Sequence, residues 1–374
     1  MRVGFNALLL SDQPGYRRSG IGRYLDRLLA ALPTALGTDE LVVYAGHTAS
    51  PADTALFTGW RRAWVSTDRP PLRIAWEHAA LPLAARRDRL DLFHGTMNVL
   101  PRFLPCPSVV TIHDLAFLRW PQQVPARRYR YLSTAVRAAS KRAAHIITVS
   151  EATKADAVEL LGIDPGRITV AHLGVDSRFH PPSEEDLLLF MTDQATDAPY
   201  ILAVGNLEPR KNLPGLLRAF AQLAPDVPHK LVLVGAEAWL TGEIHATLDR
   251  LRLGGRVRMT GFVSDDDLPL WYGAADLFVF PSLYEGFGLP VVEAMACGVP
   301  VVTSNVSSLP EVAGDAAVLV DPRDVDAIAD GLCRVLTDAD LSRRLRQSGR
   351  ERAARFTWEE TAARTVAVYR EVAG

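Results

Sequence analysis

The sequence predicts an α/β protein with two doubly wound domains, each built on a parallel sheet with helices on both faces. Short runs rich in β-branched residues alternate with amphipathic segments of helical length, and this pattern occurs twice in 374 residues. The runs are apolar almost throughout, which is typical of parallel strands buried on both faces. A Pro- and acid-rich stretch at residues 178–198 separates the two sets and is the predicted linker.

The predicted strands divide into two sets of six. The first set comprises RVGFNALL, LVVYA, DLFHG, SVVTIHD, HIITVS and ITVAHLG, and the second comprises YILAVGN, KLVLVG, VRMTGF, DLFVFPS, PVVTS and AAVLV. We expect a first domain over residues 1–181, a second over 182–355 and a final helix over 356–374. Ligands of open parallel sheets bind at the carboxyl ends of the strands, so we expect a site in a cleft between the domains.

Charge and composition narrow the class of protein. Residues 1–183 hold 23 Lys and Arg against 15 Asp and Glu, and the second half has the opposite sign. The three cysteines have no pairing or zinc-site spacing, which fits a reducing compartment. No apolar run reaches the roughly 18 residues of a membrane span, and the opening residues predict a strand rather than a secretory signal. These features predict a cytoplasmic protein.

The stretch EGFGLPVVEAMACG, residues 285–298, carries the strongest site signal. A buried strand precedes it, and Pro290 suits the first position of a helix, so we expect the helix to begin there. Glu285 then belongs to the loop and Glu293 to the first helical turn. Gly286 and Gly288 allow the backbone to approach a ligand at a helix start that favours anions. The pattern indicates a phosphate cradle with a hydroxyl-binding carboxylate on each side, as a nucleotide sugar requires. The alternative is an ordinary helix start, at which the two glutamates stand by chance and bind no ligand.

A second anion signal lies in VGNLEPRKNL, residues 204–213. Gly205 follows a strand, and Arg210 and Lys211 precede a helix, where two cations add to the positive end of the helix dipole. Lys211 is one of only four lysines among 41 basic residues. A solvated loop is the alternative, but the cradle in the same half favours phosphate binding.

The first half offers weaker signals at its strand ends. Gly20 and Gly22 in RRSGIGRY lack the third glycine of the dinucleotide fingerprint, which favours a glycine loop facing the cleft over a nicotinamide site. A plain turn is the alternative. His113, followed by Asp114, ends a strand where it could bind a sugar or organise the reacting centre, and His94 is a similar but weaker candidate. A structural role remains open for both histidines.

Several chemistries lack their sequence signals. No zinc-ligand cluster, serine-hydrolase elbow or Walker loop occurs, and the two Asp-x-Asp pairs precede helices as caps. The segment 125–145 predicts a helix whose basic face could contact an anionic membrane or a lipid diphosphate, or simply be solvated. Nucleic acid is disfavoured, because the pI of the whole chain is only about 6.5.

These motifs, in this order, resemble glycosyltransferase family 4, whose members are retaining enzymes of the GT-B fold. EGFGLPVVEAMACGVPVV resembles the family's E-x7-E motif, and VGNLEPRKN resembles its diphosphate-binding loop. SGIGRY, IHDLAF, TVSEATKAD, LGVDSRF and the segment from TGF to FPS follow in the family's order, and FTWEETAARTVAVYREV resembles its last helix, which crosses back onto the first domain. The resemblance covers nearly the whole chain.

The resemblance implies a role for each matched residue. Glu285 and His113 contact the donor sugar, Arg210 and Lys211 stabilise the departing diphosphate, and Glu293 holds the ribose. The remaining donor-binding positions are Gly20, Gly22, Gly205, Val263, Gly286, Phe287, Gly288 and Leu289. Family members are generally metal-independent, so no metal or other cofactor is expected.

The implied reaction moves a hexosyl group to a hydroxyl of a glycan or lipid-linked acceptor. Details such as SGIGRYLDRLLAALP resemble the bacterial mannosyltransferase branch, which favours GDP-mannose over a UDP-hexose. No nucleophile is evident, so same-face attack fits better than a covalent intermediate. A nucleotide-sugar epimerase and a non-catalytic nucleotide-sugar-binding protein of the same fold are the alternatives.

Overall fold

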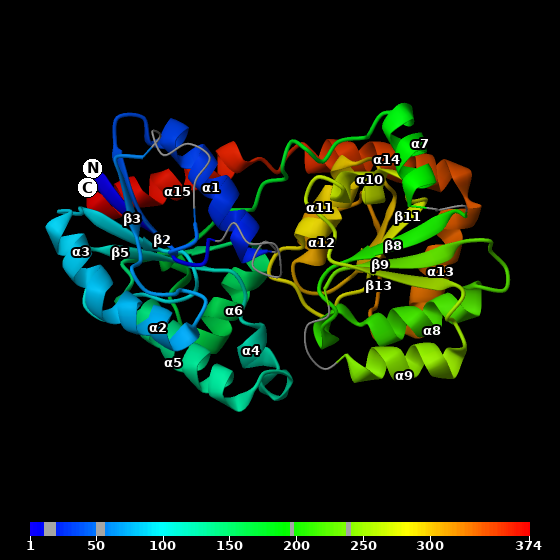
Figure 1. Ribbon diagram of the computed structural model, residues 1–374, viewed down its shortest axis with the longest axis horizontal. Coiled ribbons are helices and arrows are strands. Elements are labelled where there is room, and N and C mark those ends of the chain that lie inside the picture. Colours follow the sequence, from blue (N-terminus) through cyan, green and yellow to red (C-terminus); the bar gives the residue numbers. More distant parts are fainter. Residues whose placement is uncertain (11–19, 50–56, 195–197, 237–240) are drawn as a thin grey trace. The chain divides into compact units, whose positions relative to one another are not determined.

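The computed structural model describes residues 1–10, 20–49, 57–194, 198–236 and 241–374, which form two compact units (Figure 1). Unit 1 contains residues 1–174 together with residues 357–374, and unit 2 contains residues 175–356. The chain enters unit 2 at Val175, whereas the sequence places the boundary between residues 181 and 182. Residues 357–374 therefore complete the first unit.

The described part of unit 1 contains a seven-stranded parallel sheet in the order β3-β2-β1-β4-β5-β6-β7. Its strands are β1 Arg2–Ala7, β2 Glu40–Ala45, β3 Gly59–Arg62, β4 Leu92–Gly95, β5 Ser108–Ile112, β6 His145–Thr148 and β7 Ile168–Val170. The order reverses between β1 and β4, so the crevice above these two strands is the topological switch point.

Helices cover both faces of this sheet. They are α1 Ile21–Leu36, α2 Pro70–Ala75, α3 Leu81–Arg87, α4 Ala116–Arg119, α5 Ala126–Arg142, α6 Glu151–Leu161 and α15 Trp358–Ala373, with a π-helical segment η3 at Trp76–Ala80 and 3-10 turns η4 Pro121–Gln123 and η5 Pro165–Arg167. Figure 1 shows α1 (blue) and α15 (red) side by side on one face, while α2, α3, α5 and α6 cover the other.

The described part of unit 2 contains a six-stranded parallel sheet in the order β10-β9-β8-β11-β12-β13. Its strands are β8 Tyr200–Val204, β9 Lys230–Val234, β10 Val257–Gly261, β11 Leu277–Phe280, β12 Val301–Ser304 and β13 Val318–Val320. The switch point of this sheet lies between β8 and β11, so the residues that follow these two strands converge on one crevice.

Helices cover both faces of the second sheet as well (Figure 1). They are α7 Glu184–Asp193, α8 Leu213–Leu223, α9 Gly242–Leu251, α10 Leu268–Gly273, α11 Leu289–Ala296, α12 Leu309–Ala313, α13 Val325–Thr337 and α14 Ala339–Ala353, with a 3-10 turn η6 at Pro209–Lys211. The helix α8 is an example of how these helices pack on the sheet. Its apolar residues recur at helical spacing, and Leu216, Leu217 and Phe220 are fully buried in the core.

All twelve predicted strands are present, and one further strand, β3, was not predicted. Its sequence, GWRR, has little apolar character because β3 is a sheet edge and its two arginines are exposed. The helix predicted over residues 125–145 is α5, and its division into faces is confirmed: Val136 and Ala139 are buried, while Arg127 and Lys141 are exposed.

Candidate functional site

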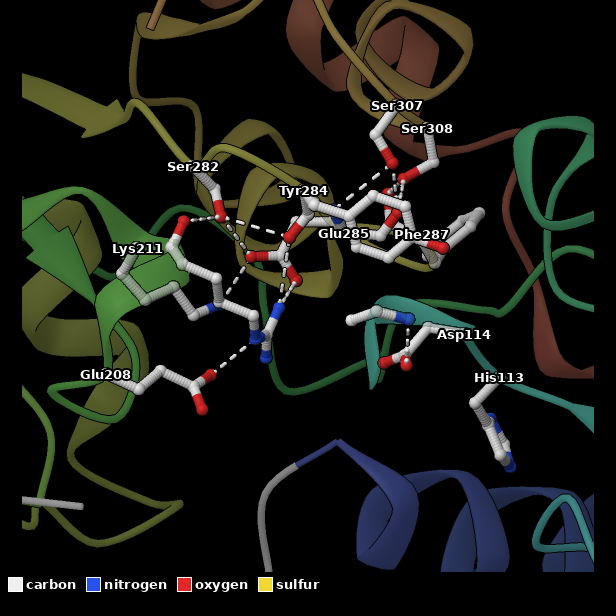
Figure 2. A network of polar contacts seen from close by, with 12 residues as sticks. His113, Asp114, Glu208, Lys211, Ser282, Tyr284, Glu285, Phe287, Ser307 and Ser308 are labelled. Carbon is white, nitrogen blue, oxygen red and sulfur yellow. Dashed lines mark hydrogen bonds and ion pairs between the residues drawn. The ribbon is translucent and has the colours of Figure 1, made fainter. Parts of the chain in front are cut away.

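Glu285 follows β11 and is surrounded by two cations and a serine hydroxyl (Figure 2). Lys211 Nζ lies 2.7 Å from Glu285 Oε1, and Ser282 Oγ donates to the same oxygen at 2.6 Å. The Arg210 guanidinium donates to the other oxygen, Oε2. Only 7% of Glu285 is exposed. Segments that follow β8 and β11 thus meet at the switch point of unit 2.

The charges of Arg210, Lys211 and Glu285 shift one another's pKa values. Burial alone would raise the pKa of Glu285, but the Arg210 and Lys211 charges outweigh burial and hold that pKa at about 2. Burial and the Arg210 charge lower the pKa of Lys211, while Glu285 opposes this effect. Glu208 Oε1 lies 2.6 Å from Arg210 Nε. The two cations are therefore balanced by two carboxylates, so an anionic ligand here must compete with Glu208 and Glu285.

The local backbone explains how both cations reach this site. Arg210 and Lys211 occupy the 3-10 turn η6, and Asn212 adopts φ 55° before α8 begins. Gly205 has φ 143°, and a Cβ there would lie 3.1 Å from Lys211 Cε. The Lys211 ammonium lies 4.4 Å from the ring centroid of Phe280. The absence of a side chain at Gly205 thus leaves room for the lysine to fold over β8 onto Phe280.

Two serine hydroxyls bind the backbone of the loop that leads into α11. Gly288 precedes the helix with φ 109°, which favours glycine. Ser308 Oγ donates to the Phe287 carbonyl at 2.7 Å, and Ser307 Oγ donates to the Glu285 carbonyl at 2.6 Å (Figure 2). The loop from Glu285 to Gly288 is therefore fixed from the segment before α12.

The predicted helix boundary at this site needs a correction. The helix α11 begins at Leu289 rather than Pro290, and Glu293 lies in its second turn rather than its first. Glu293 is 2% exposed and accepts a hydrogen bond from the Tyr272 hydroxyl at 3.0 Å. Val263 is half-buried in the segment after β10.

His113 follows β5 in unit 1, and its imidazole is held on two sides. Its Nε2 donates to the Thr96 carbonyl at 2.8 Å, and the Tyr24 ring packs edge-on against it with centroids 4.6 Å apart. The His113 backbone N–H donates to Asn98 Oδ1 at 2.9 Å. Burial lowers the pKa of His113, so the imidazole is neutral near pH 7. The bond to Thr96 places the proton on Nε2 and the lone pair on Nδ1.

His94, the weaker candidate, has a structural environment. It is fully buried, with Nδ1 2.6 Å from the Tyr369 hydroxyl and Nε2 2.7 Å from Thr111 Oγ1. Thr111 Oγ1 lies 2.9 Å from the Tyr24 hydroxyl. Burial and the nearby His113 lower the pKa of His94 to about 3, so it stays neutral. This network joins α15 to α1.

The predicted glycine loop is corrected in part. Gly20 precedes α1 with φ 37°, but Gly22 and Tyr24 lie inside α1 and are buried. The helix therefore begins earlier than the sequence suggested, since glycine in a first turn does not prevent helix formation when the following residues pack. Arg17, Arg18 and Ser19 lie outside the described residues.

Both halves of the chain match family models. Residues 18–179 match the model described as Glycosyltransferase Family 4, and residues 188–352 match Glycosyl transferases group 1. The O-antigen chain mannosyltransferase B of Escherichia coli is 34% identical over 369 residues, which cover 95% of this chain and 97% of that relative. The chain belongs to glycosyltransferase family 4.

Two further proteins are similar to this glycosyltransferase, one in sequence and one in structure. The MMP alpha-(1->4)-mannosyltransferase of Mycolicibacterium hassiacum is 32% identical over 78% of this chain and 73% of its own length. The crystal structure of Anabaena HepE in complex with UDP-glucose superposes with a TM-score of 0.76 at 21% identity, over 99% of each chain. The chain is thus a glycosyltransferase, and the predicted GT-B fold is confirmed.

The contacts around Glu285 and Glu293 in unit 2, and those around His113 in unit 1, also involve residues that the sequence did not single out. Ser282, Ser307 and Ser308 bind Glu285 and its loop, Tyr272 binds Glu293, and Thr96 and Asn98 bind His113. Ser282 stands directly after a strand in FPS, so the strand-end rule could have found it. Thr96, which follows the strand in DLFHG, could have been found in the same way. The remaining positions carry no comparable signal, because their contacts depend on how distant segments pack.

Neither a metal cluster nor a membrane span is found in the described ranges. No group of three or more His, Cys, Asp and Glu is placed to hold a metal ion there. None of the helices there is both long and apolar enough to cross a bilayer. Metal independence remains a prediction.

Proposed function

We propose that this glycosyltransferase moves a mannosyl group from GDP-mannose to a hydroxyl of a glycan or lipid-linked acceptor. The donor's anomeric configuration is retained and no metal takes part. The names of two relatives, an O-antigen chain mannosyltransferase and an MMP alpha-(1->4)-mannosyltransferase, support the sugar. The oppositely charged halves of the sequence, basic before residue 184 and acidic after it, fit two units with different ligands.

The observation that carries the proposal is the pair of cations beside Glu285. Arg210 and Lys211 meet at the switch point of unit 2, where parallel sheets bind nucleotides. Both cations precede α8, and the glycine-rich start of α11 lies on the same loop as Glu285. The diphosphate of a nucleotide sugar is a dianion that gains a further negative charge as the glycosyl bond breaks, so it needs this kind of electrostatic support when it departs.

Each predicted residue receives a role in this proposal. Arg210 and Lys211 bind the diphosphate, Glu285 and His113 bind the sugar, and Glu293 binds the ribose. The donor's other contacts come from Gly20, Gly22, Gly205, Val263, Gly286, Phe287, Gly288 and Leu289. His113 presents the lone pair of Nδ1, so it would accept a hydrogen bond from a sugar hydroxyl.

The proposed step breaks one bond and forms one. The bond between the anomeric carbon and the diphosphate oxygen breaks, and its electron pair stays on the diphosphate. The acceptor hydroxyl attacks the anomeric carbon from the same face, and its proton passes to the departing phosphate oxygen. The two cations stabilise the negative charge that develops on the diphosphate. Trapping of a glycosyl–enzyme adduct would contradict same-face attack.

The donor is tested by ligand-dependent thermal stability followed by transfer. Binding to the native state raises the melting temperature, so GDP and GDP-mannose should raise it more than UDP-glucose or ADP-glucose. UDP-glucose is the important competitor because HepE is described in complex with it. A shift with UDP-glucose alone would overturn the choice of GDP-mannose but not the family.

Transfer itself separates the remaining alternatives. Product formation that requires an acceptor supports a transferase, whereas conversion of the donor without acceptor would indicate an epimerase. Binding without any turnover would indicate a sensor. NMR of the product's anomeric proton tests retention, and unchanged rates after treatment with a chelator would support metal independence.

We also propose that the protein contacts anionic membrane through the basic face of α5. Arg127, Arg130 and Lys141 are exposed on this helix. Co-sedimentation with anionic vesicles should weaken when Arg127 and Arg130 become Gln, because each surface cation contributes about 1 kcal/mol to such binding. The matched control is Arg343→Gln with Arg344→Gln on exposed positions of α14, which should bind as the wild type does.

A further inference from the structure

Glu77 is a buried carboxyl group for which the proposed reaction has no use. It is fully buried in unit 1, in the π-helical segment η3 between α2 and α3. Short π-helical segments occur frequently at functional sites, where they redirect a side chain that a regular helix would place elsewhere. A carboxyl group without exposed surface is unusual unless it has a partner or a function.

A chain of hydrogen bonds leads from Glu77 to His113. Asn6 Nδ2 donates to Glu77 Oε1 at 2.8 Å, and Thr96 Oγ1 donates to the Asn6 carbonyl. The Thr96 carbonyl then accepts from His113 Nε2 at 2.8 Å. The four residues come from η3, β1, the end of β4 and the end of β5. All of them are at most 9% exposed.

This chain of contacts crosses the switch point of the first sheet. Asn6 lies in β1 and Thr96 directly follows β4, and these two strands are the neighbours between which the sheet order reverses. Asn6 Oδ1 also accepts from the Leu8 backbone N–H at 3.2 Å, which fixes how the chain leaves β1. Glu77 is therefore connected by hydrogen bonds, through Asn6, to the switch point at which ligands of parallel sheets bind.

We propose that Glu77 is a positioning residue for glycosyl transfer, which holds Asn6 and Thr96 so that the Thr96 carbonyl fixes the orientation and tautomer of His113. The inference rests on the proposed contact of His113 with the donor sugar. Glu77 itself touches no substrate, because it has no exposed surface.

The surroundings of Glu77 favour the neutral form. Burial raises its pKa, and Arg73 and the hydrogen bond from Asn6 oppose this only in part. Arg73 from α2 and Tyr131 from α5 are the ionisable groups that face it electrostatically. Glu77 Oε2 has no hydrogen-bond partner among the described residues, and the bond that Oε1 accepts from Asn6 favours the charged form of the carboxyl group.

The test compares kcat and KM of transfer in four proteins. The wild type, Glu77→Gln and Glu77→Ala are measured with donor and acceptor varied separately. The control is Asp88→Asn, another buried carboxyl of unit 1, which accepts from the Tyr44 hydroxyl and pairs with Arg61 rather than with this network.

The amide variant should separate positioning from charge. Glu77→Gln keeps an oxygen that can accept the hydrogen bond from Asn6, so its kcat should stay close to that of the wild type. Glu77→Ala should lower kcat about 100-fold with little change in KM, since small misplacements of a reacting group have effects of this size. Asp88→Asn should lower stability but keep the wild-type kcat.

A second measurement does not depend on the identity of the donor. In protein labelled with ¹⁵N-histidine, the His113 signal should report Nε2–H in the wild type and in Glu77→Gln, and should change in Glu77→Ala. If GDP-mannose is not a substrate, the proposed donor fails and these spectra alone decide the role of Glu77. The inference is overturned if Glu77→Gln is as impaired as Glu77→Ala, or if Glu77→Ala changes neither the His113 signal nor kcat.

Discussion

At the scale of single residues, Glu285 does more than its motif suggests. Its carboxylate joins two cations that come from a loop about 75 residues earlier in the sequence. A buried ion pair contributes little net stability when intact, but the loss of one partner leaves an uncompensated charge. Glu285 is therefore required both for the reaction that we propose and for holding Lys211 in its buried position.

Substitution of Glu285 by Ala should reveal both effects. Transfer should fall by about 10²–10³-fold, the usual effect of losing one electrostatic element of a transition state. The free energy of unfolding should fall by about 3 kcal/mol, because Lys211 loses its buried partner. Steady-state kinetics and urea unfolding measure the two quantities. Near-wild-type turnover would refute the role of Glu285.

The same carboxylate makes stability depend on acid. The folded-state pKa of Glu285 is about 2, below its ordinary value of 4.5, so its ion pairs stabilise the protein fully above pH 4.5. This contribution should disappear as the pH falls from about 4.5 to about 2. Glu285→Gln, which cannot ionise, should show a smaller loss of unfolding free energy over that range. An identical acid dependence in both proteins would contradict the lowered pKa.

At the scale of elements, the strands were predictable and the contacts of the site were not. Within the described ranges, alternating apolar runs identified the strands other than β3, whose arginines are allowed by its edge position. The sequence brought Glu285, Arg210 and Lys211 to one group of strand ends, but it could not show that the three side chains pair, because this depends on the register of β8 with β11. No sequence motif pointed to Glu77, because the role that we propose for it depends on its place in the π-helical segment η3.

At the start of α11, the backbone conformation of Gly288 predicts that a larger residue there destabilises the protein. Gly288 has φ 109°, and a Cβ there would lie 2.7 Å from Leu309 Cδ2. Gly288→Ala should therefore destabilise the protein by about 1–3 kcal/mol and raise the KM for the donor. The control is Gly242→Ala at the start of α9, where a Cβ meets nothing within 4 Å. Melting temperatures compare the two, and equal effects would argue against strain at Gly288.

At the scale of the whole molecule, each unit has its own core and should unfold in its own transition. Tyr369→Phe in α15 removes a buried hydrogen bond to His94, which should destabilise unit 1 by about 1–3 kcal/mol. The matched variant in unit 2 is Tyr200→Phe, whose hydroxyl donates to the Trp271 carbonyl at 2.7 Å.

Calorimetry should then assign one transition to each unit. Tyr369→Phe should lower one melting temperature and Tyr200→Phe the other, while GDP-mannose should raise the transition that Tyr200→Phe lowers. A single transition that both substitutions shift equally would mean that the two units unfold together.

The return of α15 to the first unit has a consequence for how the protein is made. The ribosome adds about 5–20 residues per second, and residues 175–356 are synthesised between the two parts of unit 1. The nascent first unit therefore waits on the order of ten to forty seconds for the helix that covers α1. Unit 2, which is continuous in sequence, can fold during that wait. In the living cell, the half that is translated first would be the half that matures last, and until then its uncovered apolar face would need protection by chaperones.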